Sequence, residues 1–378
     1  MSHTLTQHAV RLELDGEQLV HANLSGAAFV GNELWVAGDE ACGLDRLKLL
    51  PSVAGETLHF GEAQHFPLAD VLALPDAFDV EADIEGLDYH AGCLWLVGSH
   101  GLKRKAPKDG YDSAANLRRL ATVSSDGNRC LLAKIPLQFS DTGNTPVKHI
   151  DGEQKAIRLR GNTKGNDLTQ LLKKDRHYAA YLDIPGKDNG FDIEGLAVQD
   201  ERVLLGLRGP VLRGWAGLLE IQVKEKNDEL RLSKIAASGK KYRKHFIQLA
   251  GLGVRDLHWS GDDLIILAGP TMVLDGAIRV YRWVNAAQAL DSVASDASEV
   301  LWEQNGPVEM LQLPFGQGQD RAEAITCLPQ ELGNAPQWLV LYDAPSAARQ
   351  PAEQVVLGDI IGLTPKTPVR RTRAKASK

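Results

Sequence analysis

Cysteine is scarce in this chain and never paired in a C-x-x-C motif. The four cysteines among 378 residues stand far apart, at Cys42, Cys93, Cys130 and Cys327. This spacing argues against a zinc site and against a disulfide framework, so we expect reduced, mostly buried thiols. Reduced thiols are typical of a cytoplasmic protein.

Long apolar runs and leader signals are also missing. No stretch reaches the roughly 18 apolar residues of a membrane span. The first residues, MSHTLTQHAV, lack the basic and then apolar order of a secretory signal. We therefore expect a cytoplasmic chain with no membrane partner. Its 43% hydrophobic and 24% charged residues are typical of a globular domain with a sizeable core.

Acidic residues are absent from the last segment, 364–378. We expect this segment to be a disordered, solvated basic tail. It carries Lys366, Arg370, Arg371, Arg373, Lys375 and Lys378. Because the whole chain has a net charge of −7, residues 1–363 are more acidic than that figure suggests. An acidic body argues against nucleic acid as a main partner.

The sequence does contain an internal repeat. Five segments share a short apolar strand, a polar or glycine turn and a second apolar strand, which is typical of a β-hairpin. The segments are NLSGAAFVGNELWVAGDE, DIEGLDYHAGCLWLVGSH, DIEGLAVQDERVLLGLRG, VRDLHWSGDDLIILAGP and RAEAITCLPQELGNAPQWLVLYDAP. Equivalent hairpin ends keep the same offset in the first four, and the fifth is lengthened only in its polar turn.

Further β-like runs such as GWAGLLEIQV and AIRVYRW follow the hairpins. Four strands per unit, repeated about every 60 residues, are typical of propeller blades. We therefore predict an all-β fold, a single β-propeller over 1–363 with five visible blades, or six if one is degenerate. The early run HAVRLEL is predicted to complete the last blade and close the ring.

The gap between the second and third hairpins predicts an insertion at about 139–189. Within it, Asn166 to Leu182 has a single apolar stripe and Asn166 as an N-cap, which predicts a helix. Because the connection crosses one face of the disc, we expect the helix to cover the channel mouth. It is either a lid that opens for a ligand or a fixed buttress.

The hairpin ends bring charged residues together, because a hairpin places the start of its first strand beside the end of its second. One channel mouth is therefore predicted to hold Asp39, Glu40, Asp83, Glu85, Asp192, Glu194, Asp256, Glu323 and Asp343, with Arg208, Arg255, Arg321 and His100. Repulsion among these acids has to be offset. An ion-pair plug, a hard cation such as calcium, and a metal-free polar substrate site all remain open.

Individual residues at this mouth also have two interpretations each. His100 is a candidate base whose pKa nearby carboxylates would raise, or simply a hydrogen-bonded histidine. Arg208, between glycines, either binds an anion or pairs with Glu194. Gly86 and Gly195 either let a ligand approach closely or allow tight packing between blades.

The strings DIEGLDYHAGCLWLVGSHG, DNGFDIEGLAV, VLLGLRGPVLRGWA and GLGVRDL resemble a bacterial family known as domain of unknown function 3616. The Glu-Gly-Leu strings are also similar to motifs of calcium-dependent propeller hydrolases of the gluconolactonase/regucalcin and esterase-like phytase types. That weaker resemblance implies calcium as the cofactor, with Glu85 and Glu194 among its ligands.

The leading hypothesis is a metal-dependent hydrolase of a small anionic ester or lactone at the channel mouth. Glu85, Glu194, Asp256 and Glu323 would hold the metal. Arg208, Arg255 and Arg321 would bind the substrate, and His100 or Asp343 would move the proton. The alternative is a propeller without catalysis that binds a protein or small ligand, its ion-pair ring being structural.

Overall fold

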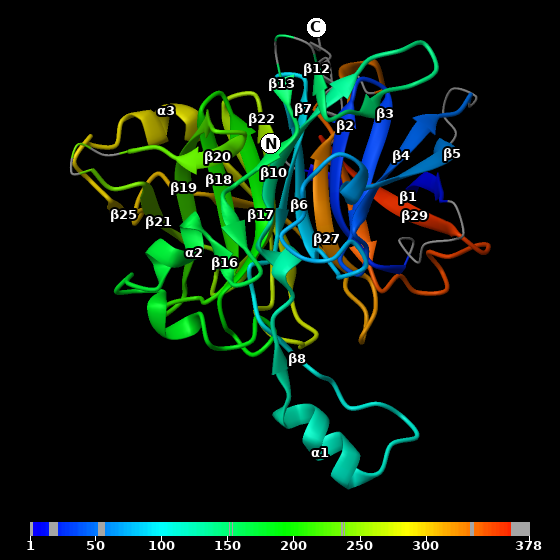
Figure 1. The fold of residues 1–378 in the computed structure, drawn as a ribbon. Coiled ribbons are helices and arrows are strands. Elements are labelled where there is room, and N and C mark those ends of the chain that lie inside the picture. Colours follow the sequence, from blue (N-terminus) through cyan, green and yellow to red (C-terminus); the bar gives the residue numbers. More distant parts are fainter. Residues whose placement is uncertain are drawn as a thin grey trace, which may run out of the picture.

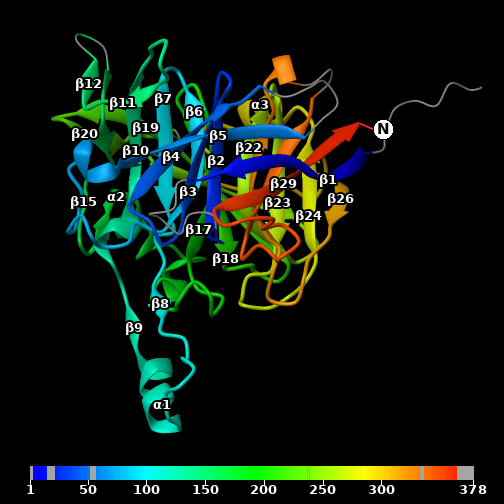
Figure 2. The same ribbon diagram turned by 90° about the vertical axis from the view of Figure 1, so that its right-hand side faces the viewer.

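The computed structural model describes residues 3–14, 22–51, 57–150, 152, 154–235, 237, 239–332 and 336–363. These residues form a ring of five blades whose inner strands pack against one another in cyclic order (Figures 1 and 2). The inner strands are β2 (Leu24–Val30), β6 (Ile84–His90), β17 (Asp192–Gln199), β22 (Gly253–Ser260) and β27 (Arg321–Cys327). The predicted single β-propeller is confirmed, and its five hairpins are the inner halves of blades 1 to 5. The predicted basic tail, 364–378, lies outside the described residues.

Each blade continues outward from its inner strand by antiparallel pairing. Blade 1 adds β3 (Glu33–Gly38), β4 (Gly43–Leu49) and β5 (Leu58–Pro67), and blade 2 adds β7 (Cys93–Gly98), β10 (Leu132–Gln138), β11 (Thr145–Pro146) and β14 (Ile157–Arg158). Blade 3 adds β18 (Arg202–Gly209), β19 (Trp215–Lys226), β20 (Glu229–Leu232), β21 (Tyr242–Gln248) and β25 (Glu299–Leu301), the last paired in parallel with β21. Blade 4 adds β23 (Asp263–Gly269), β24 (Ile278–Trp283) and β26 (Val308–Leu313), and blade 5 adds β28 (Trp338–Asp343) and β29 (Val355–Leu363).

Tight turns set the register of the inner hairpins. In blade 1, Val30 pairs with Glu33 across Gly31, which has φ +58°, and in blade 2, His90 pairs with Cys93 across a similar two-residue turn. Blades 3 and 4 repeat this geometry. Two-residue turns with positive φ match the right-handed twist of a hairpin, so they fix which residues face each other. Blade 5 has the longer turn that its sequence predicts.

The ring closes through the first strand, β1 (His3–Glu13). It pairs antiparallel with β29 and, over Val10 to Leu12, in parallel with β5. It is therefore the outer strand of blade 5, as predicted, and it also joins blades 1 and 5 into one sheet. Pairing on both sides removes two open sheet edges.

The apolar core lies between the blades. Five clusters of buried side chains each combine residues of two adjacent blades, as where Leu87 of β6 packs with Ala28 of β2. Small elements surround the blades: β12 (His149–Ile150), β13 (Gln154–Lys155), β15 (Gly161–Asn162), β16 (Gly165–Asn166), α3 (Ala286–Asp291), η2 (Leu68–Asp70), η3 (Gly127–Cys130) and η5 (Gln330–Leu332). Among the described residues, no helix is long and apolar enough to span a bilayer.

The predicted insertion helix is shorter than the sequence suggests. Helix α2 covers Asp167–Leu172, capped by Asn166, and a separate 3-10 turn, η4, covers Ala179–Tyr181. Leu168 and Leu172 are buried in the core between blades 2 and 3. The predicted helix is interrupted at Asp175. The carboxylate of Asp175 accepts hydrogen bonds from the amides of His177 and Tyr178 and so begins a new turn. The position of α2 matches a fixed buttress better than a lid.

An arm that the sequence analysis missed leaves the body between blade strands β7 and β10. It contains β8 (Lys103–Arg104), α1 (Ser113–Ala121) and β9 (Val123–Ser124), and it reaches away from the ring in both views (Figures 1 and 2). The only sequence signal was Asp112, whose carboxylate caps α1 at Ala115. No side chain of α1 is buried.

Candidate functional site at the channel mouth

Every inner hairpin carries a β-bulge at the same height. The bulge leaves one residue of the inner strand without a partner on the second strand. These residues are Ser25, Glu85, Glu194, Arg255 and Glu323. Four of them bond to a neighbouring blade: Ser25 donates to the Ile84 carbonyl, and Arg255 pairs with both Glu194 and Glu323. The bulge thus gives the channel mouth a ring of side chains with one member from each blade.

The structure corrects the prediction for Asp256, because Arg255 and not Asp256 occupies the bulge of blade 4. Asp256 lies one residue further along, at the position of Gly86 and Gly195. Its carboxylate accepts hydrogen bonds from the Ile325 amide of blade 5 and from the Leu257 amide, both at 2.7 Å. Both oxygens are therefore engaged, one in joining blades 4 and 5 and one within β22, and Asp256 is not at the mouth with the glutamates.

The glycines at that same position serve packing. A Cβ on Gly86 would lie 2.8 Å from the Leu196 Cβ, and one on Gly195 would lie 2.7 Å from the Leu257 Cγ. Adjacent inner strands approach too closely for a side chain there. The tight-packing interpretation of these glycines is therefore the better one.

A chain of buried ion pairs fills one side of the mouth. Glu194 lies 2.5 Å from an Arg208 nitrogen and 2.8 Å from Arg255, and Arg255 also pairs with Glu323. All four side chains are nearly inaccessible to solvent. Arg208 thus pairs with Glu194, and Arg255 makes its contacts to two of the predicted metal ligands. This part of the ring is an ion-pair plug.

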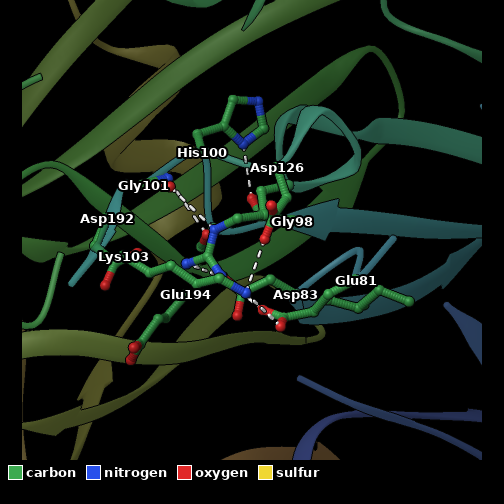
Figure 3. Close-up of polar contacts among 12 residues, drawn as sticks. Glu81, Asp83, Gly98, His100, Gly101, Lys103, Asp126, Asp192 and Glu194 are labelled. Carbon is green, nitrogen blue, oxygen red and sulfur yellow. Dashed lines mark hydrogen bonds and ion pairs between the residues drawn. The ribbon is translucent and has the colours of Figure 1, made fainter. Parts of the chain in front are cut away.

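A second ion-pair cluster lies around Arg129, which sequence analysis overlooked. Its guanidinium lies 2.8 Å from Glu81 and 2.5 Å from Asp83, and Lys103 bridges Glu81 and Asp126 (Figure 3). Arg129 comes from η3, which follows the arm. No repeat signal marks this position, so only the folded chain brings it to Asp83.

His100 is placed differently from its prediction as a base. Its Nδ1 donates to the Gly98 carbonyl at 2.7 Å (Figure 3), and its Nε2 accepts from the Asn166 side chain at 2.7 Å. Burial lowers the pKa of His100 to about 4, whereas a rise was expected. Both ring nitrogens are engaged and the ring is neutral, so His100 positions Asn166 at the start of α2 and transfers no proton.

Other charged groups at the mouth have no partner. Within the described residues, the side chains of Asp39, Glu85, Lys187 and Arg321 make no hydrogen bond or ion pair. Burial and the charges of Asp83 and Glu194 raise the pKa of Glu85 well above its usual value. Desolvation, with the charges of Glu323, Asp83 and Asp343, raises the pKa of Asp39 to about 8. Asp39 therefore carries a proton at neutral pH.

Three chain segments meet over the mouth. Leu102 pairs with Pro185, and Asp188 pairs with Met272, so the turn at 185–188 is held on both sides. Lys187, on this turn, lines two adjoining cavities. Desolvation opposes its charge, but Glu323, Glu85 and Asp39 together raise the pKa of Lys187 and keep it cationic.

The two cavities differ in charge. The larger, of about 360 Å³, is lined mainly by acids, including Asp39, Glu85 and Asp192. The charged residues that line the smaller, of about 70 Å³, are four cations and three acids: Lys187, Arg208, Arg255, Arg321, Asp275, Glu323 and Asp343. Acids therefore outnumber cations around the larger cavity, cations outnumber acids by one around the smaller, and the two cavities share Lys187.

The four predicted calcium ligands do not form one cluster. Arginine nitrogens contact Glu194 and Glu323, backbone amides hold Asp256, and only Glu85 is unpartnered. Within the described ranges, no group of three or more His, Cys, Asp and Glu residues suits a metal ion. This set of residues does not fit the oxygen cage that calcium requires.

Comparison with known proteins identifies one family and several similar folds. The family model described as a protein of unknown function, DUF3616, matches residues 23–359, and no curated protein matches. Among solved structures, an exo-1,5-α-L-arabinanase from a bovine ruminal metagenomic library has a TM-score of 0.35 and 7% identity, covering 91% of this chain and 94% of that one. The PQQ-bound aldose sugar dehydrogenase of Streptomyces coelicolor has a TM-score of 0.37 and 11% identity, covering 96% and 99%. An α-L-arabinofuranosidase of Podospora anserina in complex with cellotriose has a TM-score of 0.35 and 11% identity, covering 94% and 96%. These identities are too low to transfer chemistry.

Proposed function

The chain belongs to the DUF3616 family of proteins of unknown function, and from its channel mouth we propose that it hydrolyses a small anionic ester or lactone. The observation that carries the proposal is that two adjoining cavities hold charged groups of complementary kinds. Unpartnered cations, Lys187 and Arg321, line one cavity, and an unpartnered carboxyl of raised pKa, Asp39, lines the adjoining one. Perturbed carboxyl groups in a cleft with free cations are typical of a catalytic site.

The carboxyl pair Asp39 and Asp343 suits acid and base roles. Asn23 connects them, because its carbonyl accepts from the Asp39 amide and it forms a bridge with Asp343. The charge of Asp343 is one of the causes that raise the pKa of Asp39. Two neighbouring carboxyl groups can divide the work of acid and base between them.

In the proposed reaction, Arg321 and Lys187 hold the anionic group of the substrate. Asp343 accepts a proton from a water molecule, and the oxygen of that water bonds to the carbonyl or phosphoryl centre of the substrate. Protonated Asp39 donates its proton to the leaving oxygen. Water is added across the broken ester bond, and proton exchange between the two carboxyls and solvent restores the site. No step requires His100 or a metal.

The test is hydrolysis of a panel by the full chain: a phosphomonoester, a carboxyl ester with an acidic side chain, and an aldonolactone. We expect turnover of at least one member, with Asp39→Asn and Asp343→Asn each lowering kcat about 10²-fold or more. Asp141→Asn, at an exposed loop position, is the matched control and should retain full activity. Because Asp39 acts as the acid, kcat should fall as pH rises above about 8 in the wild type.

A propeller that binds a ligand without catalysis is the second candidate. The observation that favours it is the ion-pair plug of Arg208, Glu194, Arg255 and Glu323, which already has a structural role. In that case the panel compounds bind, with a melting-temperature shift that depends on Arg321, but none is turned over. Turnover that survives both Asp39→Asn and Asp343→Asn would remove the hydrolase proposal in its present form.

A further inference from the structure

Four apolar side chains stand exposed around the cationic cavity. Met272, Val273 and Leu274 are 41%, 57% and 59% exposed, and Phe315 is 42% exposed. All four line the cavity that also contains Arg321 and Lys187. Single exposed apolar residues are ordinary, but a group gathered at the edge of a cavity marks a binding surface.

The loops that carry these side chains are tied in place. Met272 forms a bridge with Asp188, and the Asp275 carboxylate accepts a hydrogen bond from the Gly318 amide at 2.8 Å. The first contact ties the loop at 270–277 to the turn with Lys187, and the second ties it to the loop with Phe315. The apolar rim is therefore continuous with the free cations beneath it.

The cavity itself is small, at about 70 Å³. It has room for a compact head group, whereas the exposed side chains offer apolar surface only outside it. Its four cations outnumber its three acids, Asp275, Glu323 and Asp343, and so favour a negative head group over a positive one. A ligand that contacts both parts has an anionic head and an apolar tail.

We infer that the substrate of the proposed hydrolase is an amphiphilic anion, with a carboxylate or phosphate held by Arg321 and Lys187 and an acyl or aryl tail against Val273, Leu274 and Phe315. The claim that this anion is a substrate rests on the proposed function, but binding of the anion can be measured separately. Carboxylate and phosphate head groups would be recognised by the same cations, and the experiment below compares the affinity of the two.

The experiment measures dissociation constants of butyrate, octanoate and octyl phosphate with the full chain by calorimetry. Burial of one methylene changes affinity up to about four-fold, so octanoate should bind at least ten-fold more tightly than butyrate. Octyl trimethylammonium, with the same tail and a positive head, should not bind. Comparison of octanoate with octyl phosphate shows which head the cavity prefers.

Two variants assign the effect to residues. The double variant Val273→Ser/Leu274→Ser should lose most of the difference between octanoate and butyrate while butyrate affinity stays within two-fold. Arg321→Met should weaken all three anions. The matched control is Leu117→Ser, on the arm and 66% exposed, which should change nothing.

Equal affinity for butyrate and octanoate overturns the inference, as does tight binding of octyl trimethylammonium. Equal weakening of all anions by the double variant also overturns it, because the loop would then only shape the cavity. If anions bind with the expected chain-length dependence but no ester is turned over, the hydrolase proposal fails and the binding inference stands. If esters are turned over at rates independent of chain length, the inference alone fails.

Discussion

Replacement of Arg255 by methionine tests the ion-pair plug. Methionine keeps the unbranched apolar stem of the side chain and removes the guanidinium with its charge and its hydrogen bonds. Arg255 is 4% exposed and contacts Glu194 at 2.8 Å and 3.1 Å, as well as Glu323. Glu194 retains Arg208 in the variant, but Glu323 loses the guanidinium that it contacts.

The expected cost follows from burial. Removal of one partner from a buried pair typically costs about 3–5 kcal/mol, because the other charge is left without compensation. A matched surface variant, Arg279→Met, removes a pair with Glu309 whose side chains are 28% and 44% exposed. Solvent screens such exposed pairs, so they contribute far less than buried ones. The free energy of unfolding should therefore fall several times more for Arg255→Met than for Arg279→Met.

The pH dependence has a defined sign. Burial raises the pKa of Glu323 to about 7, against the opposing charge of Arg255. A carboxyl whose pKa is higher in the folded state binds more protons there, so it lowers stability at pH values above its unfolded pKa of about 4.5. Without Arg255 the folded pKa of Glu323 rises further. The decrease in the free energy of unfolding caused by Arg255→Met should therefore grow from pH 5 to pH 8 and shrink as the pH falls.

Urea unfolding followed by tryptophan fluorescence at pH 5.5 and pH 8 measures both quantities. Pairing Arg255→Met with Glu323→Gln should recover part of the loss at pH 8, since no unpaired charge then remains on Glu323. A loss no greater than that of Arg279→Met would refute the plug. If the loss of stability in Arg255→Met grew on acidification, Glu323 would not be the group responsible for the pH dependence.

Two further predictions concern the revised site. His100 should show no protonation above about pH 5 in an NMR titration of its ring, because burial lowers its pKa to about 4; an apparent pKa near 6.5 would contradict the hydrogen-bonded placement between Gly98 and Asn166. Calcium at millimolar concentration should leave the melting temperature unchanged, because arginines and amides already contact three of the four proposed ligands; a rise with concentration, as mass action requires for a bound ion, would restore a metal site at the mouth.

The blades were predictable because repeated local patterns carry them. Strand, turn and strand recur with fixed spacing, and the two-residue turns hold the register whatever the surrounding contacts are. The closing role of the first strand followed from the missing outer strand of blade 5. The insertion helix was predicted too long, because apolar spacing does not show that Asp175 starts a new turn.

The site was predictable only in part. The offset between hairpin ends fits both Arg255 with Gly269 and Asp256 with Pro270, and matching acid with acid selected the wrong pair. The bulge that distinguishes them depends on the packing of the neighbouring strand. Arg129 and Lys187 come from segments outside the repeat, so no spacing rule places them at the mouth. The role of His100 depends on Asn166, which lies 66 residues away in sequence.

The pairing of β1 with β29 also has consequences for biosynthesis. Residues 3–13 leave the ribosome before all five inner hairpins, whereas their main partner, 355–363, is made only after those hairpins. Blade 5 therefore remains incomplete until residues 355–363 have been made, and its exposed strands are open to pairing with other nascent chains during that interval. Blade 2 draws its strands from one continuous stretch and can form as it emerges, whereas blade 3 receives β25 only after β22 to β24 of blade 4 have been made. A chain cut at the β29 boundary would lose the ring closure and not only one strand.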